Sequence, residues 1–373
     1  MTRAVGGKRM SDNLESARQL FTDALARHVE RDWAAAEPLY RAALELAPER
    51  PSIVFNLARL MLDRKDYASA EALFRRSVTL APDHESHYNL ALCLAKLDRS
   101  AEAVAQYDQA IALEPKFAQA HAGRAAALEQ LGRLMPALEA CARSVELAPE
   151  VPGYQAAFAA CARRVGRVAD LPAPALIETA ALICLMAAHV DYQDLHDVVA
   201  TLLDRRFAAF RREVSATDFD WPKIAASRLP ELQAFCNDWL LVAALEKIAL
   251  DGAADDDFLI RLRASLLKLA VIGPKTERLS ILLEPVSLFL AQQCALNRHA
   301  WPAGEEEIAL LAKLRTRVAG ALASIMPGDM DIGVLGCYVR LADIPGLAAR
   351  GAAQLSTASP ALQRLIRAQL PSG

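Results

Sequence analysis

The first half of the chain repeats one pattern of small, apolar and polar positions about every 34 residues. Two columns of this pattern are small residues, namely Ala24, Ala58, Ala91 and Ala125, then Ala36, Ala70, Ala103 and Ala137. A third column is aromatic in three of its four members, which are Tyr40, Phe74, Tyr107 and Cys141. Small residues at fixed places let paired helices approach closely. The pattern therefore predicts a series of helical hairpins, each of which needs a neighbour to bury its apolar face.

Each copy of the pattern closes on a proline. The phrases LELAP, VTLAP, IALEP and VELAP end at Pro48, Pro82, Pro115 and Pro149, at intervals of 34, 33 and 34 residues. The shorter interval arises between Pro82 and Asn89, where we expect a tightened turn. Turns between paired helices are indicated by Gly132 and Gly166, and by Asp32, Asp66 and Asp98. Residues 151–164 resemble the first helix of a fifth copy whose second helix has departed from the pattern.

Together these columns closely resemble the tetratricopeptide repeat over about 140 residues. The resemblance implies an all-α fold, with a superhelix of four to five hairpins whose concave groove binds a peptide or a partner protein. In such repeats the first helix of each hairpin lines the groove. Its outward stripe at helical spacing comprises Ser52, Asn56, Arg59 and Asp63 in the second copy, and Glu85, Asn89, Leu92 and Lys96 in the third.

Two asparagines occupy the same repeat position on this stripe. A carboxamide offers a donor and an acceptor, so it can pair with both backbone groups of one extended peptide residue. This resembles the asparagine ladder of O-GlcNAc transferase-type repeats and, more loosely, chaperone-tail clamps. The ladder stops at Thr22 and Gly123, so an unremarkable polar stripe stays equally open. The candidate peptide-binding or partner-binding groove consists of Ser52, Phe55, Asn56, Arg59, Tyr88, Asn89 and Lys96.

Beyond Pro172 and Pro174 no repeat of this length resumes. Helical periodicity continues in the segments 175–190, 194–212, 231–250, 257–271, 280–297, 304–325 and 333–342, and no segment has the pattern of a strand. We therefore expect a disordered tail at residues 1–10, a tetratricopeptide repeat domain at 11–168, and a C-terminal all-helical, bundle-like domain at 170–373.

A second resemblance involves this C-terminal region. An apolar helix followed by an aromatic residue and several glutamates resembles a segment of bacterial tetratricopeptide-repeat proteins that carry a class I methyltransferase domain. The matching residues are Gln293, Cys294, Asn297, Trp301, Glu305 and Glu307, with Cys337 and Tyr338 after them. The chain departs from the family at Arg298 and His299. It also has no Gly-x-Gly, so it lacks the Gly-rich turn that S-adenosylmethionine binding requires.

Composition narrows the possible partners. Hydrophobic residues make up 54% of the chain and the net charge is −3, which gives no basic footprint for nucleic acid. The apolar stretch 173–190 contains Glu178 and His189, and therefore predicts a buried helix in place of a membrane span. Seven scattered cysteines without a Cys-x-x-Cys motif are typical of buried thiols in a reducing cytosol. We expect a cytoplasmic location and no membrane partner; the oligomeric state stays undetermined.

Three clusters of potentially reactive side chains are better explained by structural roles than by metal binding or catalysis. The group around His189, Asp191, Asp194, His196 and Asp197 suits helix capping better than metal binding. The acidic run Asp251, Asp255, Asp256 and Asp257 lacks the spacing of a calcium loop. Cys294 and His299 are poorly spaced for a nucleophile and its base.

The sequence thus predicts no metal, no cofactor and no catalytic residue. The leading interpretation is a protein-interaction module. The alternative is the substrate-recruiting region of a protein-modifying enzyme, with an S-adenosylmethionine-dependent methyltransferase favoured over a glycosyltransferase.

Overall fold

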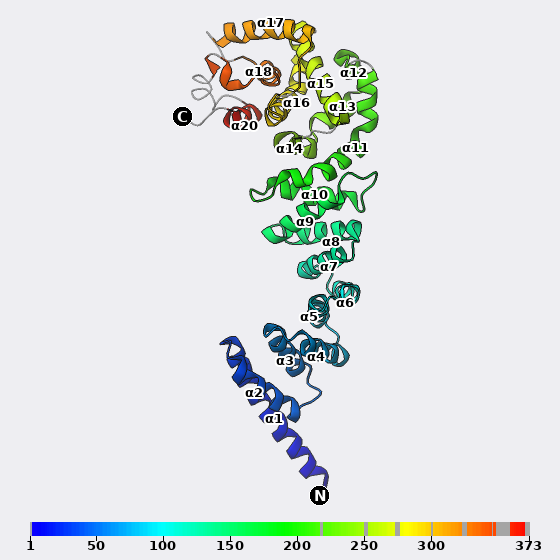
Figure 1. Ribbon diagram of the computed structural model, residues 1–373, viewed down its shortest axis with the longest axis vertical. Helices are drawn as coiled ribbons and strands as arrows, with labels where there is room; N and C mark the ends of the chain where they lie inside the picture. Colours follow the sequence, from blue (N-terminus) through cyan, green and yellow to red (C-terminus); the bar gives the residue numbers. More distant parts are fainter. Residues whose placement is uncertain are drawn as a thin grey trace. The chain divides into compact units, whose positions relative to one another are not determined.

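The structure of the chain is a computed structural model, which describes residues 2–216, 219–249, 253–272, 277–299, 301–322, 327–344, 346–347 and 359–369. Over these residues the regular structure is helical and contains no strand, which confirms the all-α prediction (Figure 1). The chain divides into two compact units, Met1–Cys161, here the repeat unit, and Ala162–Gly373, here the C-terminal unit. The division falls a few residues before the predicted boundary at 168–170.

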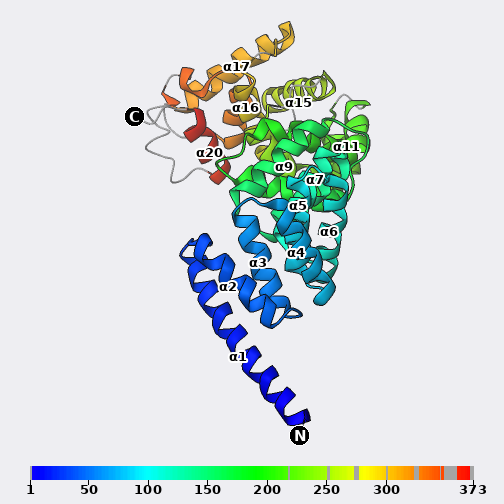
Figure 2. The same ribbon diagram turned by 60° about the horizontal axis from the view of Figure 1, so that its bottom comes forward.

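The repeat unit is a series of helical hairpins (Figure 2). Its helices are α1 Thr2–Val29, α2 Trp33–Leu46, α3 Pro51–Asp63, α4 Tyr67–Leu80, α5 His84–Lys96, α6 Ser100–Leu113, α7 Ala118–Gln130, α8 Leu134–Leu147 and α9 Pro152–Val165. The paired helices of each hairpin contact one another, and α2, α4 and α6 each contact the first helix of the next hairpin. Helix α1 begins at Thr2, so it includes residues for which the sequence indicated a disordered tail.

The turn inside each hairpin has one recurring backbone conformation. Left-handed residues with φ between 58° and 71° lie between the paired helices and after α9, at Arg31, Lys65, Asp98, Gly132 and Gly166. Each follows the first helix of its hairpin and allows the chain to reverse. The last of them comes 34 residues after Gly132, the repeat interval, which indicates that α9 is the first helix of a fifth hairpin.

The connection between α4 and α5 is shorter than its equivalents, as the sequence predicted. It comprises Ala81, Pro82 and Asp83, whereas four residues separate α2 from α3 and α6 from α7. The Asp83 carboxylate accepts from the Ser86 backbone N at 2.8 Å and from the Ser86 hydroxyl at 2.6 Å. This cap satisfies N-terminal groups of α5 and holds the tightened turn.

The predicted small and aromatic columns form the core of the repeat unit. All eight alanines are at most 1% exposed, as are Tyr40, Phe74 and Tyr107, and Cys141 is 2% exposed. Close approach is most demanding at Gly123 in α7. A Cβ built there would lie 2.5 Å from Cζ of Tyr107, so the tyrosine ring occupies the volume that a side chain would need. Glycine is therefore required for α6 and α7 to pack as they do.

The C-terminal unit continues with shorter and longer helices around a common core. They are α10 Pro174–Met186, η1 Tyr192–Leu195, α11 His196–Ala216, α12 Trp221–Ser227, α13 Leu229–Cys236, α14 Trp239–Lys247, α15 Ala253–Ile272, α16 Glu277–Leu296, α17 Glu305–Leu322, α18 Asp329–Gly336, η2 Leu341–Asp343 and α20 Pro360–Gln369.

Three features of this unit differ from the prediction. The segment expected as one helix at 231–250 divides into α13 and α14, because Asp238 caps α14 by accepting from the Leu241 backbone N at 2.8 Å. Helix α12 lies between the predicted segments 194–212 and 231–250 and begins at Trp221-Pro222, where proline at the start of a helix costs no hydrogen bond. Helix α20 has no counterpart among the predicted segments.

Helix α16 lies at the centre of the C-terminal unit and contacts α13, α14, α15, α18 and α20. In the described part of the chain, Leu279–Leu296 is the one segment long and apolar enough to cross a membrane by length and composition, and 56% of it is buried inside the protein. A Cβ at Gly333 of α18 would lie 2.5 Å from the Ser287 Oγ of α16, so these helices approach closely. Such packing explains the apolar composition of α16 as that of a core helix.

Candidate peptide-binding groove

The two asparagines of the predicted ladder lie on α3 and α5, which contact one another. Asn56 Nδ2 donates to the Ser52 carbonyl at 2.8 Å, and Asn89 Nδ2 donates to the Glu85 carbonyl at 2.8 Å. A short amide side chain on a helix readily reaches the carbonyl four residues before it. Within the described chain the two Oδ1 atoms accept no hydrogen bond. Each asparagine therefore presents an acceptor at the surface, while its donor is engaged in its own helix.

Phe55 and Tyr88 stand beside the asparagines as half-buried rings. Phe55 packs edge-on against Phe74, with ring centroids 5.7 Å apart. Tyr88 packs against Phe117 at 5.0 Å and Tyr107 at 5.9 Å, and burial raises the pKa of its hydroxyl. Since these rings are held by core neighbours, they form a fixed apolar wall next to the asparagines.

Arg59 and Lys96 are exposed, and neither takes part in an ion pair among the described residues. Asp63 and Glu85 lie on the same stripe and partly offset these positive charges. Asp63 Oδ2 also lies 2.9 Å from Nε2 of His28 in α1, so this carboxylate already has a partner within the protein. Burial raises the pKa of the nearby Tyr40 to about 12, and the positive charge of Arg59 acts in the opposite direction. The stripe thus carries two cations and one unpaired carboxylate, Glu85.

The ladder ends at Thr22 and Gly123 for two different reasons. The Thr22 hydroxyl donates to the Arg18 carbonyl at 2.9 Å, so a β-branched side chain repeats the same local bond without offering an amide. At Gly123 the Tyr107 ring fills the space of a side chain. Core packing therefore ends the ladder at Gly123, whereas at Thr22 the side chain offers no amide.

A hollow of about 530 Å³ lies next to Ser52, between α1 and the start of α3. Its walls include Leu14, Arg18, Phe21, Arg50, Ser52 and Ile53. The Arg18 and Arg50 guanidiniums are exposed and make no ion pair within the described residues. Of this set the sequence had selected Ser52 alone. The sequence could have indicated this hollow through Arg18, because Arg18 occupies the same repeat position as Ser52.

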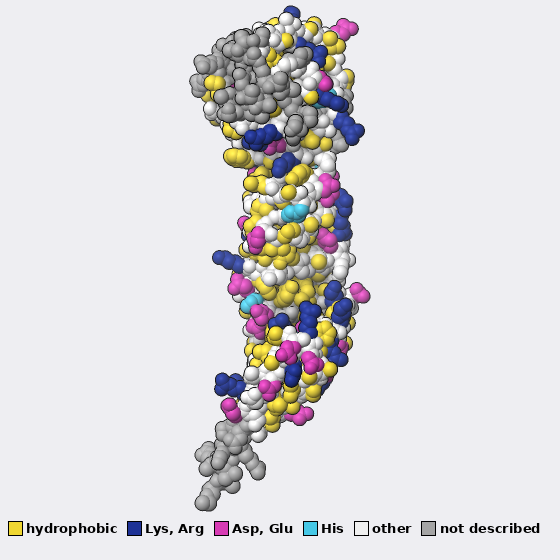
Figure 3. All heavy atoms as spheres, turned by 90° about the vertical axis from the view of Figure 1, so that its left-hand side faces the viewer, with side chains coloured by type: hydrophobic (Ala, Val, Ile, Leu, Met, Phe, Trp, Pro, Cys, Tyr) yellow, Lys and Arg dark blue, Asp and Glu magenta, His cyan; other side chains and the backbone are white. Residues whose placement is uncertain are grey.

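Figure 3 views the repeat unit from the side on which α3, α5 and α7 lie in Figure 1. At the level of α5 and α7 much of this surface is apolar, with charged side chains toward its edges, whereas at the level of α3 charged side chains also lie in its middle. This surface differs from that of the second helices, where ions pair with one another. A peptide on the face of the first helices would thus meet apolar walls and isolated charges.

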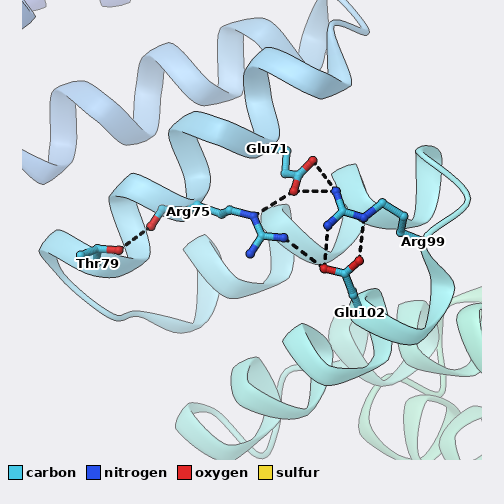
Figure 4. Close-up of polar contacts among 5 residues, drawn as sticks. All are labelled: Glu71, Arg75, Thr79, Arg99 and Glu102. Carbon is cyan, nitrogen blue, oxygen red and sulfur yellow. Dashed lines mark hydrogen bonds and ion pairs between the residues drawn. The ribbon is translucent and has the colours of Figure 1, made fainter.

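The opposite helices carry a closed ion-pair network (Figure 4). Glu71 and Arg75 of α4 join Arg99 and Glu102, with N–O distances between 2.6 and 3.2 Å. Hydrogen bonds from Arg99 hold the pKa of the Glu102 carboxyl below its usual value. Since each charge is matched inside the network, this surface offers little to a charged ligand.

Three residues of the second resemblance, Trp301, Glu307 and Tyr338, belong to a packing cluster in the C-terminal unit. Arg263 of α15 is 2% exposed and donates to the carbonyls of Trp301 at 3.1 Å and Pro302 at 2.9 Å. Its guanidinium also lies 3.4 Å from Glu307 and 4.4 Å from the ring centre of Tyr338, whose hydroxyl donates to Glu307. Burial, with the Glu307 carboxylate, raises the pKa of Tyr338. We call this set the Arg263 cluster. Its contacts account for Trp301, Glu307 and Tyr338 structurally.

The described side chains of the cluster around His189 do not converge on a common centre. His189 is exposed, Asp191 caps η1 by accepting from Gln193 N at 3.1 Å, and His196 contacts Asp197 at 3.0 Å. The side chains of Asp251, Asp255 and Asp256 lie outside the described residues, and Asp257 is exposed.

The seven cysteines are all buried, as predicted. Cys294 is 1% exposed in α16, and His299 Nε2 lies 3.1 Å from the Gly336 carbonyl. The buried thiol and this histidine contact account for both side chains as packing groups.

Comparison with known proteins agrees with the repeat unit. Models of the tetratricopeptide repeat family match residues 29–97 and 84–117. No significant match was found among curated proteins. Among solved structures, YrrB, described as a tetratricopeptide-repeat protein with an unusual peptide-binding site, is 16% identical; the match covers 53% of this chain and 90% of YrrB, with a TM-score of 0.39.

Two further solved structures are similar at the same level. MamA from Desulfovibrio magneticus RS-1 is 18% identical over 45% of this chain and 90% of its own, with a TM-score of 0.39. PilF from Pseudomonas aeruginosa is 15% identical over 60% of this chain and 98% of its own, with a TM-score of 0.40.

Proposed function

Since the chain carries tetratricopeptide repeats, we propose that its repeat unit binds an extended segment of a partner protein along α3 and α5. The observation that carries this proposal is the set of unmatched groups on one stripe. Two amide oxygens, two cations and two anchored aromatic rings lie there, whereas Glu71, Arg75, Arg99 and Glu102 on the opposite side of the hairpins pair with one another.

Asn56 and Asn89 would bind the backbone of this segment. Each Oδ1 is available to accept a peptide N–H without any rearrangement. Each Nδ2 would exchange its bond to the helix carbonyl for one to a peptide carbonyl, so this second bond adds less free energy than a bond made by an unengaged donor. Recognition at these positions depends on extended conformation more than on sequence.

The unpaired cations set the charge preference. Arg59 and Lys96 lie on the same stripe as the asparagines, and Arg18 and Arg50 flank the adjoining hollow. With Asp63 engaged by His28, acidic side chains or a terminal carboxylate on the ligand are favoured. Because these charges are exposed, their contribution weakens with added salt.

A peptide array with acidic and neutral dodecapeptides tests the proposal directly. The full chain is applied to the array, and a selected peptide is titrated against wild type and the Asn56→Ala/Asn89→Ala variant. Two lost hydrogen-bonding partners at about 0.5–1.5 kcal/mol each predict binding weaker by roughly 5- to 150-fold. We expect a value in the lower half of this range, because each Nδ2 only exchanges its bond to the helix carbonyl for one to the peptide.

Asn237→Ala is the matched control for this titration. Asn237 Nδ2 donates to the Gln233 carbonyl at 2.9 Å, the same local bond, but it lies in the C-terminal unit. The control should bind the peptide like wild type. Equal affinity of the double variant and wild type would exclude the asparagine stripe as the binding surface.

A second candidate function rests on the resemblance of the C-terminal unit to the segment that precedes a methyltransferase domain. In this interpretation the groove recruits a protein substrate for a protein-modifying enzyme. The coding sequence after Gly373 decides between them: continuation into a Gly-rich βα turn favours the enzyme, and a stop codon favours the adaptor. For the adaptor we propose a cytoplasmic location, which cell fractionation tests.

A further inference from the structure

Three potential metal ligands converge where the fourth hairpin meets α9. They are the Glu129 carboxylate near the end of α7, the Cys141 thiol in α8 and the Cys161 thiol in α9, and their ligand atoms all lie within 4.8 Å of one another. The two cysteines are 2% and 0% exposed, and Glu129 is half-buried. Across the described residues this is the one group of three or more such donors at this spacing.

The repeat itself explains how this group arises. Cys141 occupies the aromatic column, where the other repeats bury Tyr40, Phe74 and Tyr107. In the first repeat the corresponding pair is Tyr40 and His28, with Nδ1 of His28 3.4 Å from the tyrosine hydroxyl. Glu129 replaces that histidine and Cys141 replaces that ring. The smaller side chain leaves room for a second thiol, which α9 supplies through Cys161.

We propose that Glu129, Cys141 and Cys161 bind a thiophilic divalent cation, with Zn²⁺ as the best match. Zinc binds thiolates and carboxylates in tetrahedral geometry, with Zn–S near 2.3 Å and Zn–O of about 2.0–2.2 Å. Donor atoms of such a site lie about 3.6–3.8 Å apart, so small side-chain rotations bring the three within bonding distance. A water molecule or the second carboxylate oxygen completes the coordination. The ion would tie α7, α8 and α9 together.

The protonation state of the thiols makes metal binding dependent on pH. Zn²⁺ must replace the thiol protons, and the apparent affinity therefore rises with pH. Two thiolates and one carboxylate offset the two charges of the ion, so the buried site is left with one net negative charge.

A second pair of neighbouring thiols provides a contrast within the same chain. Cys294 and Cys337 interact directly in the C-terminal unit, and burial raises the pKa of Cys337. The positive charge of Arg263 acts on this pair, and within the part of the chain that the structure describes no carboxylate completes a three-donor group there. A cation placed there would be repelled by the guanidinium, so we assign the cation to the Glu129 group.

Cobalt titration tests the assignment, because Co²⁺ reports thiolate ligation by its charge-transfer absorption. The full chain is reduced, stripped with a chelator and titrated with Co²⁺, then with Zn²⁺. We expect one Co²⁺ per chain with a thiolate band that Zn²⁺ abolishes. Cys141→Ala and Cys161→Ala should each weaken binding by at least about 100-fold, beyond the 10- to 100-fold effect of outer-shell partners. Glu129→Gln should weaken binding and keep the band.

Cys93→Ala and Cys337→Ala are the controls, since both remove buried thiols outside the group, and both should keep the band. If Cys141→Ala and Cys161→Ala lose helical circular dichroism, the test uses the wild type instead and measures the protons released when Zn²⁺ is added. About two protons are expected per ion. The proposal is overturned if the reduced chain shows no thiolate band or releases no protons. It is also overturned if the band survives in well-folded Cys141→Ala and Cys161→Ala variants, or if a Cys141–Cys161 disulfide forms while the reduced chain binds no cobalt.

Discussion

The repeat unit and the C-terminal unit are both all-helical, but they distribute their contacts differently. In the repeat unit each hairpin meets its neighbours through the same small and aromatic positions, at intervals of 33 or 34 residues. In the C-terminal unit Arg263 reaches Glu307 across 44 residues of sequence, and Arg364 reaches Glu246 across 118. Nearest-neighbour contacts confine the effect of a substitution to adjacent repeats, whereas the C-terminal unit depends on the simultaneous packing of distant helices.

The largest effect of a single substitution is expected for Arg263→Leu. Removing the guanidinium leaves the carbonyls of Trp301 and Pro302 without their donor and the Glu307 carboxylate without its cation in a nearly closed environment. Breaking a buried ion pair by removing one member costs about 3–5 kcal/mol. Hydrogen exchange of α15, α17 and α18 should therefore accelerate, while that of α3–α6 stays unchanged.

Lys268→Ala controls for the loss of a cation on the same helix. Lys268 pairs with Glu306 at 3.0 Å, but 44% of its side-chain surface is exposed, so its removal should cost at most about 1 kcal/mol. If Arg263→Leu accelerates exchange no more than this control does, the Arg263 cluster does not stabilise the unit.

The next largest effect concerns the repeat unit. Gly123→Val would force Tyr107 out of its place between α6 and α7, because a Cβ at residue 123 meets the ring at 2.5 Å. Overpacking of this kind costs about 1–3 kcal/mol. The loss should be local to α5–α8, which hydrogen exchange resolves helix by helix.

Gly153→Val is the matched control, since no atom lies within 4 Å of a Cβ at Gly153 and this residue is also in the first helix of a hairpin. It should leave stability unchanged or raise it slightly, because glycine is a poor helix former. A global loss of protection in Gly123→Val would contradict the nearest-neighbour description of the repeat unit.

The sequence predicted the repeat unit far better than the C-terminal unit, for physical reasons. Periodic columns reveal themselves by recurrence, so the positions of Ala58 and Tyr107 followed from spacing alone. The left-handed turns at Arg31 and Lys65 did not, because arginine and lysine carry no preference for that conformation and the fold imposes it. The role of Arg263 was also hidden, since its partners follow 38 to 44 residues later without any local pattern.

The positions of the stripe residues followed from the sequence, but the contacts of their side chains followed only in part. Spacing placed Asn56 and Asn89 on one stripe, yet it could not show that both donors bind their own helix. Nor could spacing show that His28 of the preceding hairpin contacts the Asp63 carboxylate. The metal-ligand group was missed because Glu129, Cys141 and Cys161 resemble no known ligand motif and meet only after three helices have packed.

The smallest effect, and the sharpest test of locality, comes from a surface ion pair in the first repeats. The Glu37 carboxylate accepts from Arg41 at 2.8 Å and also pairs with Arg64, and these contacts, the Arg41 hydrogen bond above all, lower its pKa. A carboxyl whose pKa is lower in the folded state adds stability above its unfolded pKa, and this stability disappears as the pH falls through the folded value.

Because Arg41 is largely exposed, Glu37→Gln should cost only about 0.2–1 kcal/mol at pH 7. Urea titrations of wild type and variant should therefore differ at pH 7 and converge near pH 3, while Glu45→Gln, an exposed carboxylate on α2 outside any ion pair in the described residues, leaves the titration unchanged at both. A difference between Glu37→Gln and wild type that persisted at pH 3 would trace to lost packing of the side chain, since the charge is neutralised there in both proteins.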